Sequence, residues 1–220
     1  TSYIGQLYFL AVCGYHSYCP YWYNGFTTFI VTPPGWYFFA LPWYYLTKSV
    51  TAAFVLSVAA MLIIACASIM FFGKRLGWSK LKSFSFFAIL FGNTLSLGVF
   101  LRLGRVHAML DFVLLIMLFF IIWGYRTKKI DFLFFSSSIV YSMMLVTHYQ
   151  ETILAGLFFL GLFLYKKDAK EKLAVMLSLV IGIALSLWWT AGFVRGIASS
   201  VLPTLYEGMR VLEFTKDVIV

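Results

Sequence analysis

The sequence predicts an all-α membrane protein with about six transmembrane helices and an N-terminal region that lies at the membrane interface. First, 62% of the 220 residues are hydrophobic and only 11% are charged, whereas about a quarter of the residues in a soluble domain are charged. Second, apolar runs approach the roughly 20 residues that cross a bilayer as a helix. Third, the basic residues gather in short segments between these runs.

Six apolar runs are the predicted spans. The second contains Gly92-Asn93, which we interpret as a kink or a helix-packing position. The fourth and fifth are shorter than 20 residues and would need their polar neighbours to cross the bilayer. In chain order the runs are Ser49–Phe72, Ser83–Leu101, Val106–Tyr125, Phe132–Thr147, Thr152–Tyr165 and Ala174–Gly192.

Three clusters of basic residues follow the first, third and fifth runs and predict the topology. Two runs separate each cluster from the next, so all three lie on one side, which short Lys/Arg-rich loops mark as cytoplasmic. The formal charge of +9 therefore indicates loop orientation in a multi-pass cell-membrane protein, and we expect no nucleic-acid partner. The clusters are Lys74, Arg75, Lys80 and Lys82; Arg126, Lys128 and Lys129; and Lys166, Lys167, Lys170 and Lys172.

This topology divides the chain into three regions. Residues 1–48 form an outer-face aromatic region, residues 49–192 form the transmembrane region, and residues 193–220 form an outer-face amphipathic segment that begins a further part. Within the first region, Pro34–Leu46 is rich in Trp and Tyr and has only about twelve residues. Such aromatic side chains favour the headgroup level, so we predict a helix lying along the outer interface.

The three cysteines form neither a CxxC motif nor a metal-ligand spacing. Cys66 lies inside an apolar run and is expected to pack as a small apolar residue. Cys13 and Cys19 could pair on an oxidising face, but their spacing does not require it.

Arg102 and Arg105 are the cationic candidates on the outer side. Their i,i+3 spacing would place them on one face of a helical segment. Arginine offers a planar fork of donors to phosphate, so these residues are candidates for binding a phosphate. The alternative is that both extend to the phosphates of ordinary lipid headgroups.

The other ionisable candidates lie near the predicted outer turns. His107 and Asp111, at i,i+4, are expected to pair with each other or with a neighbouring helix. His148 and Glu151, with Gln150 between them, could be a metal-ligand pair, a general base, or contacts to phosphate and acceptor. The alternative is a solvated turn with an acid at a helix start. His16 and Trp188-Trp189 are first interpreted as residues at the headgroup level.

Five short motifs occur in order along the chain. They resemble the C-type glycosyltransferase (GT-C) superfamily, most closely its prokaryotic membrane branch labelled 6-pyruvoyl-tetrahydropterin synthase-related. Thr27 and Thr32 depart from that branch's pattern of Pro and Tyr. The motifs are Tyr21-Trp22-Tyr23-Asn24-Gly25-Phe26, Pro33-Pro34-Gly35-Trp36-Tyr37, Leu103-Gly104-Arg105-Val106, Thr147-His148 and Leu185-Ser186-Leu187-Trp188-Trp189.

The resemblance implies transfer of a sugar from a polyprenyl-phosphate-linked donor to an acceptor on the outer face. It also implies an acidic base in the first outer loop, often with a divalent cation such as Mg²⁺ or Mn²⁺. No acid precedes Asp111, so we expect that base upstream of Thr1, with Glu151 as a weaker candidate.

We expect membrane lipid and the sugar donor as partners. There are six substrate-binding candidates. Of these, Arg102, Arg105 and His148 should converge with Glu151 around one outward-facing cavity roofed by the aromatic segment Tyr21–Tyr37. The alternatives are a transporter or lipid-handling protein without catalysis, and an inactive GT-C relative. The candidates are Arg102, Arg105, His148, Gln150, Trp22 and Tyr37.

Overall fold

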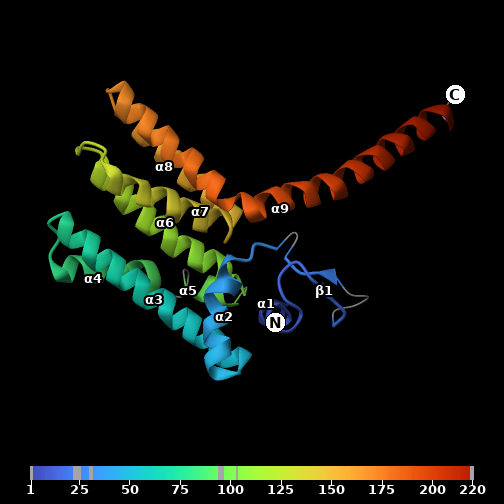
Figure 1. Ribbon diagram of the computed structural model, residues 1–220, viewed down its shortest axis with the longest axis horizontal. Coiled ribbons are helices and arrows are strands. Elements are labelled where there is room, and N and C mark those ends of the chain that lie inside the picture. The colour runs from blue at the N-terminus through green and yellow to red at the C-terminus, as the bar shows by residue number, and fades with distance from the viewer. Residues whose placement is uncertain (1, 22–25, 30–31, 94–96, 103, 219–220) are drawn as a thin grey trace.

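The protein is almost entirely helical, as its composition predicts (Figure 1). The computed structural model describes residues 2–21, 26–29, 32–93, 97–102 and 104–218, without the side chains of residues 2, 3, 26, 99, 102 and 196–218. The elements are α1 (Ser2–Cys13), β1 (Tyr18–Cys19), β2 (Phe26–Thr27), α2 (Gly35–Thr47), α3 (Val50–Arg75), α4 (Lys80–Phe91), α5 (Leu97–Arg102), α6 (Val106–Tyr125), η1 (Phe132–Phe135), α7 (Ser136–Leu145), α8 (Tyr149–Tyr165) and α9 (Ala169–Val218).

Among the described residues, three helices are long and apolar enough to cross a membrane. They are α3, α6 and the Ala169–Arg195 part of α9. Shorter apolar helices cover Ile4–Cys13, Phe132–Leu145 and Tyr149–Tyr165. The all-α class and the membrane-like character predicted from the sequence are therefore confirmed, and the number of spans is taken up under the proposed function.

The helix α6 lies at the centre of the helical body. It packs against α3 on one side and against α7 and α8 on the other, and most of its side chains are buried. The rings of Phe72 on α3 and Phe120 on α6 stack with centroids 5.6 Å apart. Because α6 is covered by protein while α3 and α9 remain largely exposed, α3 and α9 have the surface expected of lipid-facing helices.

The predicted second span is interrupted at Gly92-Asn93. Gly92 caps α4, with its N–H bonded to the Ala88 carbonyl, and α5 begins at Leu97. A second break follows at Gly104, whose φ of +66° lies outside the helical region, so α5 and α6 are separate helices. Arg102 ends α5 and Arg105 caps α6, so the expectation that both arginines share one helical face is wrong.

The three basic clusters meet at one end of the molecule, at the left in Figure 1. Arg75, Arg126 and Lys128 line one cavity there. Lys166 donates from Nζ to the Lys128 carbonyl at 2.6 Å and to Glu171 Oε1 at 3.0 Å. The three clusters therefore lie at one end of the molecule, and their location on the cytoplasmic side of a membrane stays a prediction.

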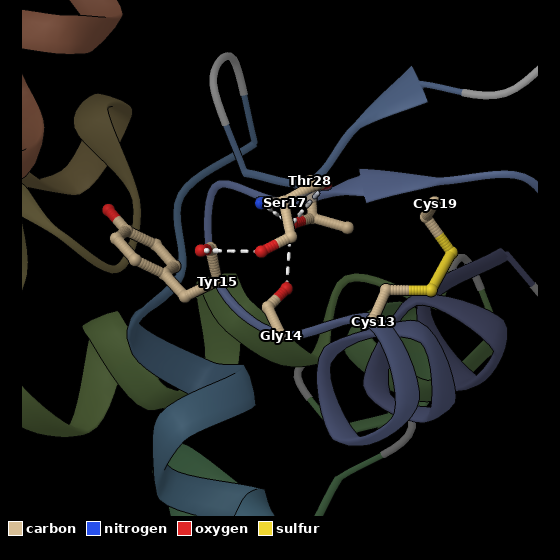
Figure 2. The surroundings of a disulfide bond; sticks show 6 residues. All are labelled: Cys13, Gly14, Tyr15, Ser17, Cys19 and Thr28. Atoms are coloured by element: carbon tan, nitrogen blue, oxygen red, sulfur yellow. Dashed lines mark hydrogen bonds between the residues drawn. A yellow bond between two sulfur atoms is a disulfide. The ribbon is translucent and has the colours of Figure 1, made fainter.

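The N-terminal residues contain structure that the sequence did not predict. The helix α1 is followed by a short antiparallel hairpin that pairs Tyr18 with Thr27. Cys13 and Cys19 form a disulfide across this junction (Figure 2). Thr28 fixes the hairpin, since its hydroxyl donates to the Gly14 carbonyl at 2.8 Å. The disulfide was one of two possibilities left open by the sequence.

The predicted interfacial helix forms as α2, with Pro34 as its N-cap and Pro42 inside it. Its 13 residues span about 20 Å, less than the roughly 30 Å of a bilayer core. It packs against α1, α3 and α6, and its orientation to a membrane stays a prediction. At the other terminus, α9 continues as a helix past Gly192 to Val218, away from the helical body (Figure 1).

Candidate functional site

A group of ionisable side chains lies at the end of the helical body opposite the basic clusters. Its centre is the start of α8, where His148 is the N-cap in an extended conformation. The His148 carbonyl accepts a hydrogen bond from the Thr152 hydroxyl at 2.7 Å, which fixes the first turn. The His148 side chain is 8% exposed, so it is held against protein and not in a solvated turn.

Glu151 pairs with His148 within this first turn of α8. The Glu151 carboxylate contacts His148 Nδ1 as an ion pair and hydrogen bond. A carboxylate in the first turn also interacts favourably with the helix N-terminus. The two residues therefore meet at i,i+3, as their spacing suggested, and Glu151 keeps 20% side-chain exposure.

Asp111 from α6 joins the pair across the helix interface. It offers a carboxylate oxygen that lies, with ligand atoms of His148 and Glu151, in a group within 4.8 Å of one another. Asp111 is fully buried, and neither of its oxygens has a hydrogen-bond partner among the described residues. Asp111 therefore lies against residues of the neighbouring helix α8, which is one of the two arrangements that the sequence left open for it.

His107 and Arg105 extend the group toward the surface along α6. The His107 ring lies with its centroid 4.7 Å from that of His148, and Arg105 is within electrostatic range of His107. Arg105 caps α6 and is exposed. A cation at the surface therefore lies beside two carboxylates and two imidazoles, of which Asp111 and His148 are buried and His107 and Glu151 are half-buried.

The start of α2 positions the His148 turn. The Gly35 N–H donates to the Val146 carbonyl at 2.8 Å, two residues before His148. A Cβ on Gly35 would lie 2.9 Å from both the Thr147 Cα and the Val146 carbonyl oxygen. The Pro-Pro-Gly segment therefore supports this turn by direct backbone contact, which only glycine permits.

Aromatic side chains from α2, α9 and the hairpin region pack beside the site. Trp189 is buried and donates from Nε1 to the Phe29 carbonyl at 3.0 Å. The ring of Trp188, which is 53% exposed, lies 5.7 Å from that of Tyr15 between centroids. Tyr15 in turn stacks on His16. These contacts hold the N-terminal residues against α9.

The remaining predicted site residues lie in different surroundings. Tyr37 is buried, and its hydroxyl donates to Gln6 Oε1 at 2.8 Å, so its ring supports α2 from within. Gln150 is exposed. Trp22 and the Arg102 side chain lie outside the described residues. Asp111 was not predicted as a member of this site, although an acid inside an apolar run is a signal for one.

Comparison of the chain with protein-family models, with curated proteins and with solved structures found no match.

Proposed function

We propose that this chain is a membrane glycosyltransferase that moves a sugar from a polyprenyl-phosphate-linked donor to an acceptor at the outer face. One observation carries the proposal: Arg105, His148 and Glu151, which come from two different predicted outer turns, lie around one polar group at the end opposite the basic clusters. Asp111 and His107 complete that group.

The proposed topology has six spans with the basic clusters in the cytoplasm. The long helices α3, α6 and α9 supply three spans. The α4–α5 pair, η1 with α7, and α8 supply the shorter three, with their polar neighbours at the ends. The Cys13–Cys19 disulfide supports an outer location for the opposite end, because disulfides persist in oxidising surroundings and are rare in the cytosol.

The reaction requires a held phosphate and an acceptor that loses a proton. The acceptor oxygen attacks the anomeric carbon, and the bond from that carbon to the phosphate oxygen breaks with its electron pair staying on the phosphate. Arg105 is placed to contact this phosphate because it is exposed beside the group. The carboxylates of Asp111 and Glu151 have chemistry suited to proton transfer or to cation binding.

The first test measures binding of polyprenyl phosphate to the full chain in lipid nanodiscs. Arg105→Ala should weaken binding tenfold or more, since a hydrogen bond to a charged group contributes about 1.5–3 kcal/mol. Lys128→Ala removes a cation at the other end and should leave affinity unchanged. Equal losses in the two variants would indicate nonspecific attraction to lipid phosphates and would overturn the carrier site.

A second test measures transfer of labelled hexose from a polyprenyl-phosphate hexose in native membranes that supply the acceptor. Wild type should consume the donor, and Glu151→Gln should lose at least about a hundredfold in rate, as expected when a group that takes part in proton transfer or charge stabilisation is removed. Specific binding of the carrier without any transfer would instead indicate a transporter, a lipid-handling protein or an inactive relative.

A further inference from the structure

We propose that Asp111, His148 and Glu151 bind one divalent transition-metal ion. The inference deepens the proposed function, because the ion would lie where the donor phosphate is expected, but its test does not depend on transfer activity. The three ligands come from two helices, with Asp111 on α6 and the other two on the first turn of α8. They are 37 or more residues apart across that interface, so the site exists only in the folded chain.

The distances suit a shared ion. One ligand atom from each residue lies within 4.8 Å of the other two. Metal–ligand bonds of about 2.0–2.2 Å separate ligands on opposite sides of an ion by at most about 4.4 Å. The three atoms are therefore close enough to share an ion after small side-chain rotations, in which the Glu151 carboxylate would exchange its bond to His148 Nδ1 for a bond to the ion.

The second observation is that the Asp111 carboxyl is buried without a hydrogen-bond partner among the described residues. Its side chain has no exposed surface, and both carboxylate oxygens lack a hydrogen-bond partner among the described residues. An unpaired buried carboxylate costs several kcal/mol or more, and buried charges in proteins are normally paired or coordinate metals. The Asp111 oxygens are directed into the group formed with His148 and Glu151, so an ion there would give a partner to a buried carboxyl that has none among the described residues.

The ligand types favour particular ions. One imidazole with two carboxylates suits Zn²⁺ or Mn²⁺, whereas Mg²⁺ and Ca²⁺ prefer all-oxygen sites. Of the two ions expected by resemblance, the described residues therefore favour Mn²⁺ over Mg²⁺. Three protein ligands also leave a coordination position open, as in catalytic zinc sites.

A bound ion would also remove an electrostatic conflict in the proposed function. Two carboxylates beside the expected phosphate position repel a phosphate, and Arg105 alone does not offset both. A divalent cation between them would reverse the sign of the local charge. Its open position could then be taken by a phosphate oxygen of the donor.

The experiment uses the full chain in detergent, stripped of metal with a chelator and titrated with Mn²⁺ or Zn²⁺. Wild type should bind one ion per chain. The Mn²⁺ complex should show nitrogen coupling from an imidazole in pulsed electron paramagnetic resonance. Asp111→Asn should weaken binding at least tenfold, and His148→Ala should remove the nitrogen coupling. Asp131→Asn, which alters a carboxylate at the other end, should change neither.

Thermal unfolding distinguishes lost binding from lost folding. Saturating Mn²⁺ should raise the melting temperature of wild type by several degrees, since a ligand of the native state stabilises it by mass action. Metal-free Asp111→Asn should be about as stable as metal-free wild type, because it replaces a buried carboxyl that has no partner among the described residues by a group of similar shape, and it should not respond to Mn²⁺. Absence of saturable binding, or binding unaffected by Asp111→Asn, would overturn the site.

The site and the proposed function can fail separately. Metal binding with no transfer of hexose would refute the proposed transferase activity and support the metal site. Full transfer of hexose by chelator-treated protein that binds neither Mn²⁺ nor Zn²⁺ would refute the metal site and support the transferase activity.

Discussion

Gly35 is the residue whose size most directly positions the candidate site. It is the first residue of α2, and its backbone contacts Val146 and Thr147 at the turn that leads into α8. The neighbouring atoms at 2.9 Å belong to backbone and cannot rotate away. The motif Pro-Pro-Gly thus determines how closely the aromatic segment approaches His148.

Gly35→Ala should destabilise the protein by about 1–3 kcal/mol, the usual cost of overpacking, and should weaken metal binding because the His148 turn is displaced. Urea unfolding in detergent and Mn²⁺ titration would measure the two effects. Gly161→Ala on α8 is the matched control, because nothing lies within 4 Å of a Cβ there. If both variants behave as wild type does, the contact between α2 and this turn does not position the site.

Asp131 gives a pH prediction in the loop before η1, at the basic end. The Tyr125 hydroxyl donates to its carboxylate, as does the Leu133 N–H, and these bonds hold the pKa of Asp131 below its ordinary value of 3.8. A carboxyl whose pKa is lower in the folded state stabilises the protein above its unfolded pKa and loses this effect as pH falls through the folded pKa.

The stability difference between wild type and Asp131→Asn should therefore be full at about pH 5 and should shrink progressively below the ordinary value of 3.8. Thermal unfolding in detergent at a series of pH values would measure it. A difference that stays constant through this acid range would contradict the assignment of the effect to the ionised Asp131.

At the scale of elements, α7 and α9 pack through small side chains. Ser178 of α9 bonds to the hydroxyls of Ser137 and Ser138 of α7, both at 2.8 Å, and all three are buried. Gly182, one turn further along α9, brings that helix against Tyr141. A Cβ at position 182 would lie only 3.0 Å from the Tyr141 ring. Small and hydroxyl residues are typical of close helix interfaces within membranes.

Ser178→Ala should destabilise the protein by about 0.5–2 kcal/mol, since hydrogen bonds between membrane helices contribute roughly 0.6 kcal/mol on average. Ser186→Ala is the matched control on the same helix. Ser186 is also buried, but its hydroxyl bonds to the Ile183 carbonyl of its own helix at 2.8 Å. Unfolding in mixed detergent would compare them, and an equal cost would mean that the hydroxyls do not join α7 to α9.

The whole molecule has two chemically different ends. One carries the three basic clusters, and Lys166 and Glu171 connect two of these loops. The other carries the Cys13–Cys19 disulfide, the aromatic segment and the Asp111–His148–Glu151 group. The molecule therefore differs in charge and chemistry from one end to the other, as a membrane protein with a fixed orientation does.

This polarity predicts the result of labelling single cysteines in intact cells. Cysteines at Lys74, Arg126 and Lys167 should all be protected from an impermeant reagent, because the positive-inside rule places these loops in the cytoplasm. A cysteine at Gln150, which is exposed at the opposite end, should be labelled. Labelling of any one of the three basic positions from outside would refute the topology.

The fold class was predictable from local chemistry. Long apolar runs form helices because a bilayer leaves no other partner for the backbone, and the predicted run Val106–Tyr125 matches α6. Ser49 begins the first run as the N-cap of α3, and its side chain accepts a hydrogen bond from the Ala52 N–H. The grouping of the basic clusters followed from counting runs between them.

The sequence by itself determined that the chain is helical, suited to a membrane and basic at one end, because hydropathy and charge are properties of short segments. Only the tertiary structure decided that Asp111 faces His148 and Glu151 and that Gly35 supports their turn. It also decided that Gly104 separates the two arginines. These facts join residues on different helices or depend on one dihedral angle, and no periodic pattern in the sequence records which face of α6 meets α8. The candidate site is thus a consequence of helix packing.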